Sequence, residues 1–302
     1  MAAERPHTAN DDTADSQKLP EFPSAEAEAH LRSPFALSDE ARNAYRRDGF
    51  VLLRRVLDPN VVAAARPHLI GALERHWPAQ ERSAAERDDA YSRAFVQITK
   101  VGLGDGTVRA FTHARRIGRV AAELMGVRGV RIYCEDWLLK RPSAGETPWH
   151  QDSCVFPFDT VAAITAWIPI HDIDASMGLP RYARGSHASG LAPVENISEE
   201  SNREFARLIA ERGIEVTNMS PLAAGDICFH DGLTIHSAWP NESSQLRYVL
   251  ALHMFADGAR IREPTTPSMR HQLNDFAPGL KPGDPAVVPS WPLIYSADEE
   301  RP

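Results

Sequence analysis

The sequence has few cysteines and no long apolar run. Its three cysteines, in 302 residues, contain no Cys-x-x-Cys pair, which excludes a disulfide framework and fits a reducing compartment. The first residues include no apolar segment of the kind that forms a secretory signal. The longest apolar run, residues 161–170, is too short to cross a bilayer. These absences predict a cytoplasmic protein with no membrane partner.

An excess of positive charge is also missing. The chain has 33 Lys and Arg against 41 Asp and Glu, a net charge of −8, which argues against a surface that neutralises phosphates. We therefore expect no nucleic-acid partner. Apolar residues make up 43% and charged residues 25% of the chain, as in an ordinary globular protein. Residues 1–33 hold few large apolar side chains, so they are predicted to form a disordered tail.

Residues 34–302 are predicted to form a single domain in three parts. The first, about 34–126, has helix signals: Ser38 precedes two acids at a predicted N-cap, and Gly126 ends the last predicted helix. A second helix is expected from residue 58 to about 77, with a kink at Pro67. After residue 126 the apolar period changes from helical to alternating. Strand-like runs follow at 130–135, 161–170, 226–230, 234–239 and 246–255.

Helices followed by many short strands predict a mainly β fold with flanking helices. The expected core, about 127–260, is a double-stranded β-helix, the jelly roll of cupin-like proteins, packed against the N-terminal helices. One further helix is expected at about 199–211. Residues 261–302 are predicted to form a C-terminal extension.

The segment TPWHQD at 147–152 carries the sharpest chemical signal. His150 and Asp152 are two residues apart, so on an extended strand both point to one face. His236 lies on a later strand that a jelly roll can bring alongside. Two imidazoles and one carboxylate on one face leave octahedral positions open, as in the facial triad of Fe(II) oxygenases. Imidazole also suits Zn, Cu and Ni, and an isolated His-x-Asp pair is more often an ordinary polar pair.

Arg247 is the second signal. A hairpin after His236 would place Arg247 on the neighbouring strand, inside the barrel. A buried guanidinium is costly unless a carboxylate meets it in a bidentate pair, and the distal carboxylate of 2-oxoglutarate would be such a partner. The alternative is an ion pair with an acidic neighbour on an edge strand.

Several motifs occur in a fixed order along residues 36–295: ITKV (98–101), LLKRP (138–142), TPWHQD (147–152), TAWIPI (165–170) and AGDICFHDGLTIHSAWPN (224–241). This ordered set resembles the phytanoyl-CoA dioxygenase family. The resemblance implies Fe(II), 2-oxoglutarate and O₂ as cofactors. It implies iron ligands and catalytic residues at His150, Asp152 and His236, and co-substrate contacts at Arg247, Lys100, Trp167 and Thr147. One departure is Ala238, where the family often has a serine that contacts the co-substrate.

The predicted function is a non-haem Fe(II)- and 2-oxoglutarate-dependent dioxygenase. It is expected to hydroxylate a small-molecule metabolite or natural-product intermediate, with release of succinate and CO₂. The alternative is a cupin-like metal-binding or ligand-sensing module without turnover. A halogenase is disfavoured, because Asp152 stands where chloride would bind. The remaining histidines (His171, His187, His230 and His253) could be ligands or bases, but they are expected to be structural or hydrogen-bonded residues near the barrel. Lys140 could contact substrate or co-substrate, but a lysine at a strand end is expected to be solvated.

Overall fold

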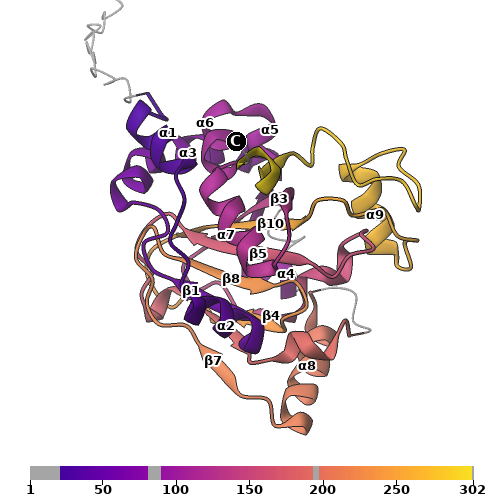
Figure 1. Cartoon of the computed structure of the whole chain (residues 1–302). Coiled ribbons are helices and arrows are strands. Elements are labelled where there is room, and N and C mark those ends of the chain that lie inside the picture. Colours follow the sequence, from indigo (N-terminus) through magenta and orange to yellow (C-terminus); the bar gives the residue numbers. More distant parts are fainter. Residues whose placement is uncertain (1–20, 81–89, 193–196, 301–302) are drawn as a thin grey trace, which may run out of the picture.

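The computed structural model describes residues 21–80, 90–192 and 197–300. Within them, two antiparallel sheets form the core (Figure 1). The large sheet has the order β1-β8-β5-β10-β3-β11, with β2 also paired to β3, and the small sheet has the order β4-β9-β6-β7. The large sheet consists of β1 (Phe50–Leu53), β2 (Val96–Thr99), β3 (Gly129–Lys140), β5 (Ala163–Pro169), β8 (Ile227–Asp231), β10 (Arg247–Ala256) and β11 (Leu293–Ser296). The small sheet consists of β4 (Thr147–His150), β6 (Pro180–Ala183), β7 (Val216–Asn218) and β9 (His236–Ala238).

The two sheets pack face to face. Phe50 of β1 stacks on Tyr182 of β6 with ring centroids 4.6 Å apart, and both belong to one buried cluster with Trp167 and Val249 of the large sheet. Strand β5 is buried along its whole length, because one of its faces meets the small sheet and the other meets helices. The predicted jelly-roll core is confirmed, with strand ends that differ from the prediction by a few residues.

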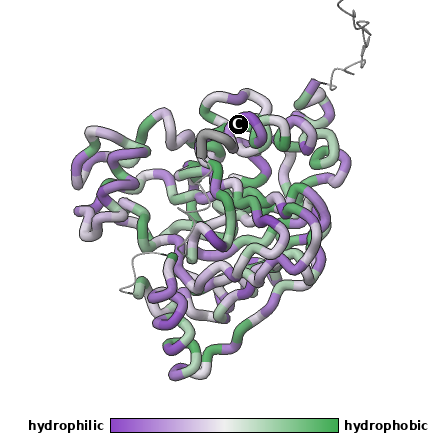
Figure 2. The backbone as a smooth tube through the Cα atoms, turned by 180° about the vertical axis from the view of Figure 1, so that it is seen from behind, coloured by the Kyte–Doolittle hydropathy of each residue, from purple (hydrophilic) through white to green (hydrophobic). Residues whose placement is uncertain are grey.

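Helices cover the outer face of the large sheet. They are α1 (Ala25–Arg32), α2 (Asp39–Asp48), α3 (Pro59–Gln80), α5 (Val101–Gly104), α6 (Gly106–Thr112) and α7 (Arg115–Met125). The short helix α4 (Ala90–Ala94) packs instead on β4 of the small sheet. The largest apolar cluster joins side chains from these helices, such as Leu69 and Phe111, to Ile164, Ile168 and Leu250 of the sheet. Figure 2 shows the hydrophobic stretches gathered in the middle of the molecule. No helix in the described part of the chain is long and apolar enough to cross a membrane.

One prediction for the N-terminal part needs correction. The predicted tail over residues 1–33 is wrong for residues 21–33, where Ser24 caps α1 and Phe22 and Leu31 are buried in the main cluster. Residues 1–20 lie outside the described residues. Helix α3 runs through Pro67, and the kink predicted there stays a prediction. The single-domain assignment of residues 34–302 stays a prediction.

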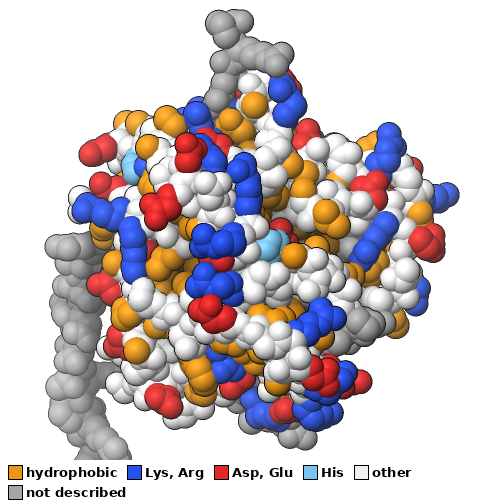
Figure 3. Space-filling model, turned by 60° about the horizontal axis from the view of Figure 1, so that its bottom comes forward, with side chains coloured by type: hydrophobic (Ala, Val, Ile, Leu, Met, Phe, Trp, Pro, Cys, Tyr) orange, Lys and Arg blue, Asp and Glu red, His pale blue; other side chains and the backbone are white. Residues whose placement is uncertain are grey.

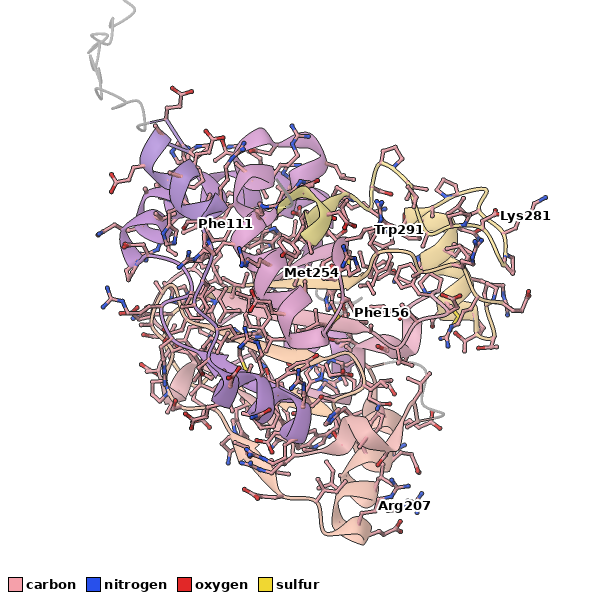
Figure 4. All side chains as sticks on the ribbon, viewed as in Figure 1. Phe111, Phe156, Arg207, Met254, Lys281 and Trp291 are labelled. Carbon is pink, nitrogen blue, oxygen red and sulfur yellow. The ribbon has the colours of Figure 1, made fainter. Side chains whose placement is uncertain are left out.

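Two more helices lie later in the chain, one after β6 and one after β10. Helix α8 (Glu199–Arg212) packs on β4, and α9 (Pro267–Phe276) belongs to the C-terminal extension. The extension is attached by a second apolar cluster that includes Phe156 and Trp291, which lie between the sheet and the extension in Figure 4. The face in Figure 3 mixes basic with acidic side chains, and on α8 Arg207 pairs with Glu204 and Glu211.

Candidate active site

Three metal-ligand side chains converge between the sheets. His150 ends β4, His236 begins β9 directly opposite it, and Asp152 begins the 3-10 turn after β4 (Asp152–Val155). The Nε2 atoms of both histidines lie 3.6 Å from Asp152 Oδ1, and one ligand atom from each residue fits within 4.8 Å. The side chains of His150 and Asp152 are 9% exposed, and that of His236 is 11% exposed. The structure thus brings together the three residues predicted from the sequence.

Hydrogen bonds fix which imidazole nitrogen faces the centre. His150 Nδ1 donates to the carbonyl of Pro148 at 2.8 Å, and His236 Nδ1 donates to the carbonyl of Thr234 at 3.0 Å. A carbonyl can only accept, so Nδ1 carries the hydrogen and the Nε2 lone pair is free for a metal. Burial and the neighbouring His150 hold the pKa of His236 well below its usual range, which keeps that ring neutral. The tautomer is therefore the one that ligates metals.

The second oxygen of Asp152 is held by Thr165 and His230, for which no contact with a metal ligand was predicted. Thr165 of β5 donates to Oδ2 at 2.7 Å, and Nε2 of His230 lies 3.0 Å from the same atom. Burial would raise the pKa of Asp152, but the surrounding histidines outweigh it and hold the pKa well below its usual range. Asp152 is thus a carboxylate with one oxygen anchored and the other turned toward the histidines.

A chain of contacts continues past Thr165. His253 Nδ1 lies 2.8 Å from Thr165 Oγ1, and its Nε2 lies 3.2 Å from Asp136 Oδ2. Burial would lower the pKa of His253, but Asp152 and Asp136 outweigh it and raise the pKa. His230 and His253 are hydrogen-bonded residues near the barrel, as predicted, and both support the ligand Asp152. The available signal was that Thr165 and His230 lie opposite each other on adjacent strands.

Arg247 is buried without an anionic partner. Its side chain is 1% exposed, and its guanidinium lies 5.4 Å from the ring of Trp167. One nitrogen donates to the carbonyl of Gly178, but Nε has no hydrogen-bond partner among the described residues. No carboxylate in that part of the chain forms an ion pair with it, and burial lowers its pKa to about 9. Such an orphaned guanidinium is suited to a ligand carboxylate.

The other predicted co-substrate residues divide into two groups. Thr147 and Trp167 line the same cavity as Arg247 and the three metal-ligand residues. Lys100 does not line this cavity, so its prediction as a co-substrate contact is not supported by its position. Its Nζ pairs with Asp275 at 2.7 Å and lies over the ring of Phe276. The residue of β2 that lines the cavity is Gln97.

The cavity is large and partly aromatic. Its volume is about 640 Å³, and its walls include Tyr91, Phe95, Phe156 and Leu138 as well as the polar side chain of Asp136. Pockets of roughly 300–1,000 Å³ with apolar walls and a few polar groups are typical of sites for drug-sized ligands. The cavity therefore has room for a small dicarboxylate and a second organic molecule.

Comparison with known proteins identifies the family. The phytanoyl-CoA dioxygenase (PhyH) family profile matches residues 45–249. A phytanoyl-CoA dioxygenase domain-containing protein 1 homolog from Dictyostelium discoideum is 28% identical over 118 residues, covering 38% of this chain and 42% of that protein, well under two thirds of its length. The chain belongs to the phytanoyl-CoA dioxygenase family.

Solved structures agree with this assignment. The non-haem α-ketoglutarate-dependent carbocyclase SnoK from nogalamycin biosynthesis has a TM-score of 0.69 and 27% identity, covering 86% of this chain and 99% of that chain. The epimerase SnoN, in complex with Fe³⁺, α-ketoglutarate and nogalamycin RO, has a TM-score of 0.67 and 28% identity, covering 85% and 98%. The predicted class, a 2-oxoglutarate-dependent non-haem oxygenase with iron and 2-oxoglutarate as cofactors, is confirmed.

Proposed function

We propose that this protein hydroxylates a ring-bearing small molecule, with iron held by His150, Asp152 and His236 and 2-oxoglutarate held by Arg247. The observation that carries the proposal is the pairing of two incomplete sites in one cavity. One is a set of three metal ligands, and the other is a buried guanidinium without a counter-ion. A metal and a dicarboxylate complete both sites.

The residues fit both groups. Two neutral imidazoles and one carboxylate oxygen leave coordination positions for a keto acid and O₂. When bound, iron and 2-oxoglutarate would supply electrons for the reduction of O₂, and this chemistry would drive cleavage of a substrate C–H bond. Thr165 and His230 hold Asp152 in its ligating orientation. Arg247 orients the distal carboxylate, and the aromatic walls exclude water from the reacting atoms.

The substrate class follows from the cavity and from the relatives. Tyr91, Phe95 and Phe156 offer flat apolar surfaces on which a ring system packs. The epimerase SnoN, a structural relative, was crystallised with nogalamycin RO, and SnoK is named as a carbocyclase of the same biosynthesis. These features support a cyclic natural-product intermediate as substrate. The balanced reaction converts substrate, O₂ and 2-oxoglutarate into hydroxylated product, succinate and CO₂.

An anaerobic titration tests the two sites first. Adding 2-oxoglutarate to the Fe(II)-loaded protein should produce a weak visible charge-transfer band, because the keto acid chelates the metal. His236→Ala should lose the band. The matched control His76→Ala changes a histidine of α3 that bonds to Ala72 and does not line the cavity, so it should retain the band. A well-folded, iron-loaded protein without a band contradicts the proposal.

A library of cyclic natural products then tests turnover. Under O₂, a substrate should give succinate and a product heavier by one oxygen atom. Loss of two hydrogens would indicate ring closure, and unchanged mass with inverted stereochemistry would indicate epimerisation. A protein that binds iron and 2-oxoglutarate but converts no 2-oxoglutarate into succinate across the library would favour the ligand-sensing module.

A further inference from the structure

Lys140 lies beside the proposed co-substrate site without lining the cavity. It ends β3, directly opposite Arg247 in the register of β3 and β10, so both side chains point to the same face of the sheet. Lys140 is 0% exposed, although the sequence predicted a solvated lysine. Its Cδ lies near Gly178, where the left-handed backbone (φ +77°) leaves no room for a Cβ against the carbonyl of Trp239. The stem is therefore enclosed.

The charges around Lys140 do not balance it. Arg247 faces it from β10, Arg181 from β6, and Glu146 from the segment before β4. The carboxylate of Glu146 is engaged by Arg181 in an ion pair. Lys140 forms no ion pair with any carboxylate of the described residues. Lys140 and the buried cation Arg247 thus share a region in which Glu146, the nearby acid, is already engaged by Arg181, while Arg247 itself lines the cavity.

Thr147 connects Lys140 to the cavity. Lys140 Nζ lies 3.2 Å from Thr147 Oγ1, and Thr147 lines the cavity with Arg247. A hydroxyl has one hydrogen to donate and lone pairs to accept. An ammonium can only donate, so it occupies a lone pair of Oγ1 and leaves the hydroxyl hydrogen free to point elsewhere. Because Thr147 lines the cavity, this hydroxyl hydrogen can point toward a ligand bound there.

We infer that Lys140 is a positioning residue for the co-substrate: its ammonium holds Thr147 as a hydrogen-bond donor to the carboxylate that pairs with Arg247. The inference rests on the proposed function, since it assumes that 2-oxoglutarate binds at Arg247. It adds a residue that acts on the ligand through Thr147 and through its charge.

A protonation change should accompany binding. Burial and the charge of Arg247 lower the pKa of Lys140 to about 6, so at neutral pH the amine is largely uncharged before the ligand arrives. A carboxylate brought next to Arg247 favours the charged form and raises this pKa. Binding of 2-oxoglutarate therefore takes up a proton. Between the two pKa values of Lys140, the Kd should rise tenfold for each pH unit.

Calorimetry measures this proton directly. The Fe(II)-loaded protein is titrated anaerobically with 2-oxoglutarate at pH 7.5 in two buffers that differ in ionisation enthalpy. The native protein should take up about one proton, which the difference between the two observed enthalpies reports. Lys140→Met keeps the apolar stem of the side chain and should bind 2-oxoglutarate without proton uptake. Its affinity should be weaker than that of the native protein by roughly tenfold or more, because a charge-assisted hydrogen bond is lost.

Two variants serve as matched controls. Lys281→Met removes a lysine at the outer edge of the extension (Figure 4) and should leave uptake and Kd unchanged. Thr147→Val removes the hydroxyl and should weaken binding. Adding Lys140→Met to Thr147→Val should cost less than Lys140→Met alone, because the two residues act through one hydrogen bond. Melting temperature and Fe(II) affinity should stay near native in each variant.

The outcomes separate the two proposals. A native protein that binds Fe(II) but gives no heat with 2-oxoglutarate at any pH overturns the proposed function. A native protein that binds 2-oxoglutarate without proton uptake, with Lys140→Met binding equally well, overturns the role of Lys140 and leaves the proposed function standing. Full additivity of the two substitutions would place Lys140 outside the Thr147 contact.

Discussion

Replacing Arg247 by leucine should separate binding from folding. The guanidinium is fully buried and lacks an anionic partner among the described residues. In the proposed complex it forms a desolvated charge pair with the distal carboxylate of 2-oxoglutarate. Truncating one partner of such a pair costs roughly 2–5 kcal/mol, or on the order of 30- to several-thousand-fold in affinity. Arg247→Leu should lose that much affinity for 2-oxoglutarate and keep its affinity for Fe(II).

The same substitution should not destabilise the ligand-free protein by a comparable amount. Burial lowers the pKa of Arg247 from 12.5 to about 9, which corresponds to a cost on the order of 5 kcal/mol for holding the charged form inside. Leucine removes this cost and also removes the contacts with Gly178 and Trp167. The two effects oppose each other, so the free energy of unfolding without ligand should change far less than the binding free energy.

The assay is anaerobic titration of 2-oxoglutarate, followed by the visible band and by calorimetry, together with urea unfolding of both proteins. Arg207→Leu is the matched control, because Arg207 lies on the outer surface of α8 (Figure 4) and pairs only with exposed acids there. It should bind 2-oxoglutarate like the native protein. Equal affinity in Arg247→Leu would refute the reasoning and remove Arg247 from the co-substrate site.

Four further substitutions or truncations test other parts of the structure. Thr165→Val removes the hydroxyl that anchors Asp152 and should weaken Fe(II) binding roughly 10- to 100-fold in a chelator competition; an unchanged affinity contradicts this role. Burial raises the pKa of Glu135 from 4.5 to about 7, so the folded protein holds a proton that the unfolded chain releases. Its contribution to stability is then lost as pH rises across that range, by on the order of 3 kcal/mol. Urea unfolding at pH 5 and 7.5 should show a smaller loss for Glu135→Gln, and an equal loss would exclude Glu135 as its source. Lys100→Met should leave the affinity for 2-oxoglutarate unchanged, whereas a clear loss would restore Lys100 as a contact. A chain that starts at residue 34 lacks α1 and its buried apolar contacts, so its urea midpoint should fall, and an equal midpoint would mean that α1 adds nothing.

The metal-ligand residues could be predicted because their signal is local. The spacing of His150 and Asp152 needs only an extended strand, and the order of the motifs places His236 on a later strand. Arg247 was predictable for a similar reason, since it follows His236 on the next strand. In the structure β4 and β9 are direct neighbours, and His150 stands opposite His236.

Lys100 lies away from the cavity, although the motif that contains it predicted a co-substrate contact. Side chains of β2 alternate between two faces, so Gln97 lines the cavity while Ile98 is buried in the core. A shift of one residue moves a side chain to the opposite face. The left-handed backbone at Lys100 (φ 61°) then ends the strand, and the side chain turns to Asp275. The motif predicted the strand, but it did not determine which of its side chains face the cavity or at which residue the strand ends.

Helix α1 and Lys140 were missed because their environment is built by distant parts of the chain. The average composition of residues 1–33 is polar, yet Ala27 and Leu31 lie four residues apart and face the core. A lysine at a strand end is solvated unless something encloses it. Here the turn at Gly178 and the Asn241 side chain, which donates to the Lys140 carbonyl, close around it. Neither closure is visible from the residues next to Lys140.

The distribution of charge in and beside the cavity links the stability of the empty protein to its affinity for a ligand. Asp152 is balanced by histidines and a hydroxyl, so its region is satisfied before a metal binds. Arg247 is a buried cation with no acid in contact among the described residues, and burial and the charge of Arg247 keep Lys140 largely uncharged at neutral pH until a ligand binds. An uncompensated charge of this kind lowers the stability of the empty protein, and a ligand that compensates it returns that free energy on binding. Part of the affinity for the co-substrate therefore comes from relief of the free-energy cost of this buried charge. Because only an anion can relieve that cost, the site favours a dianion over a neutral ligand of the same size.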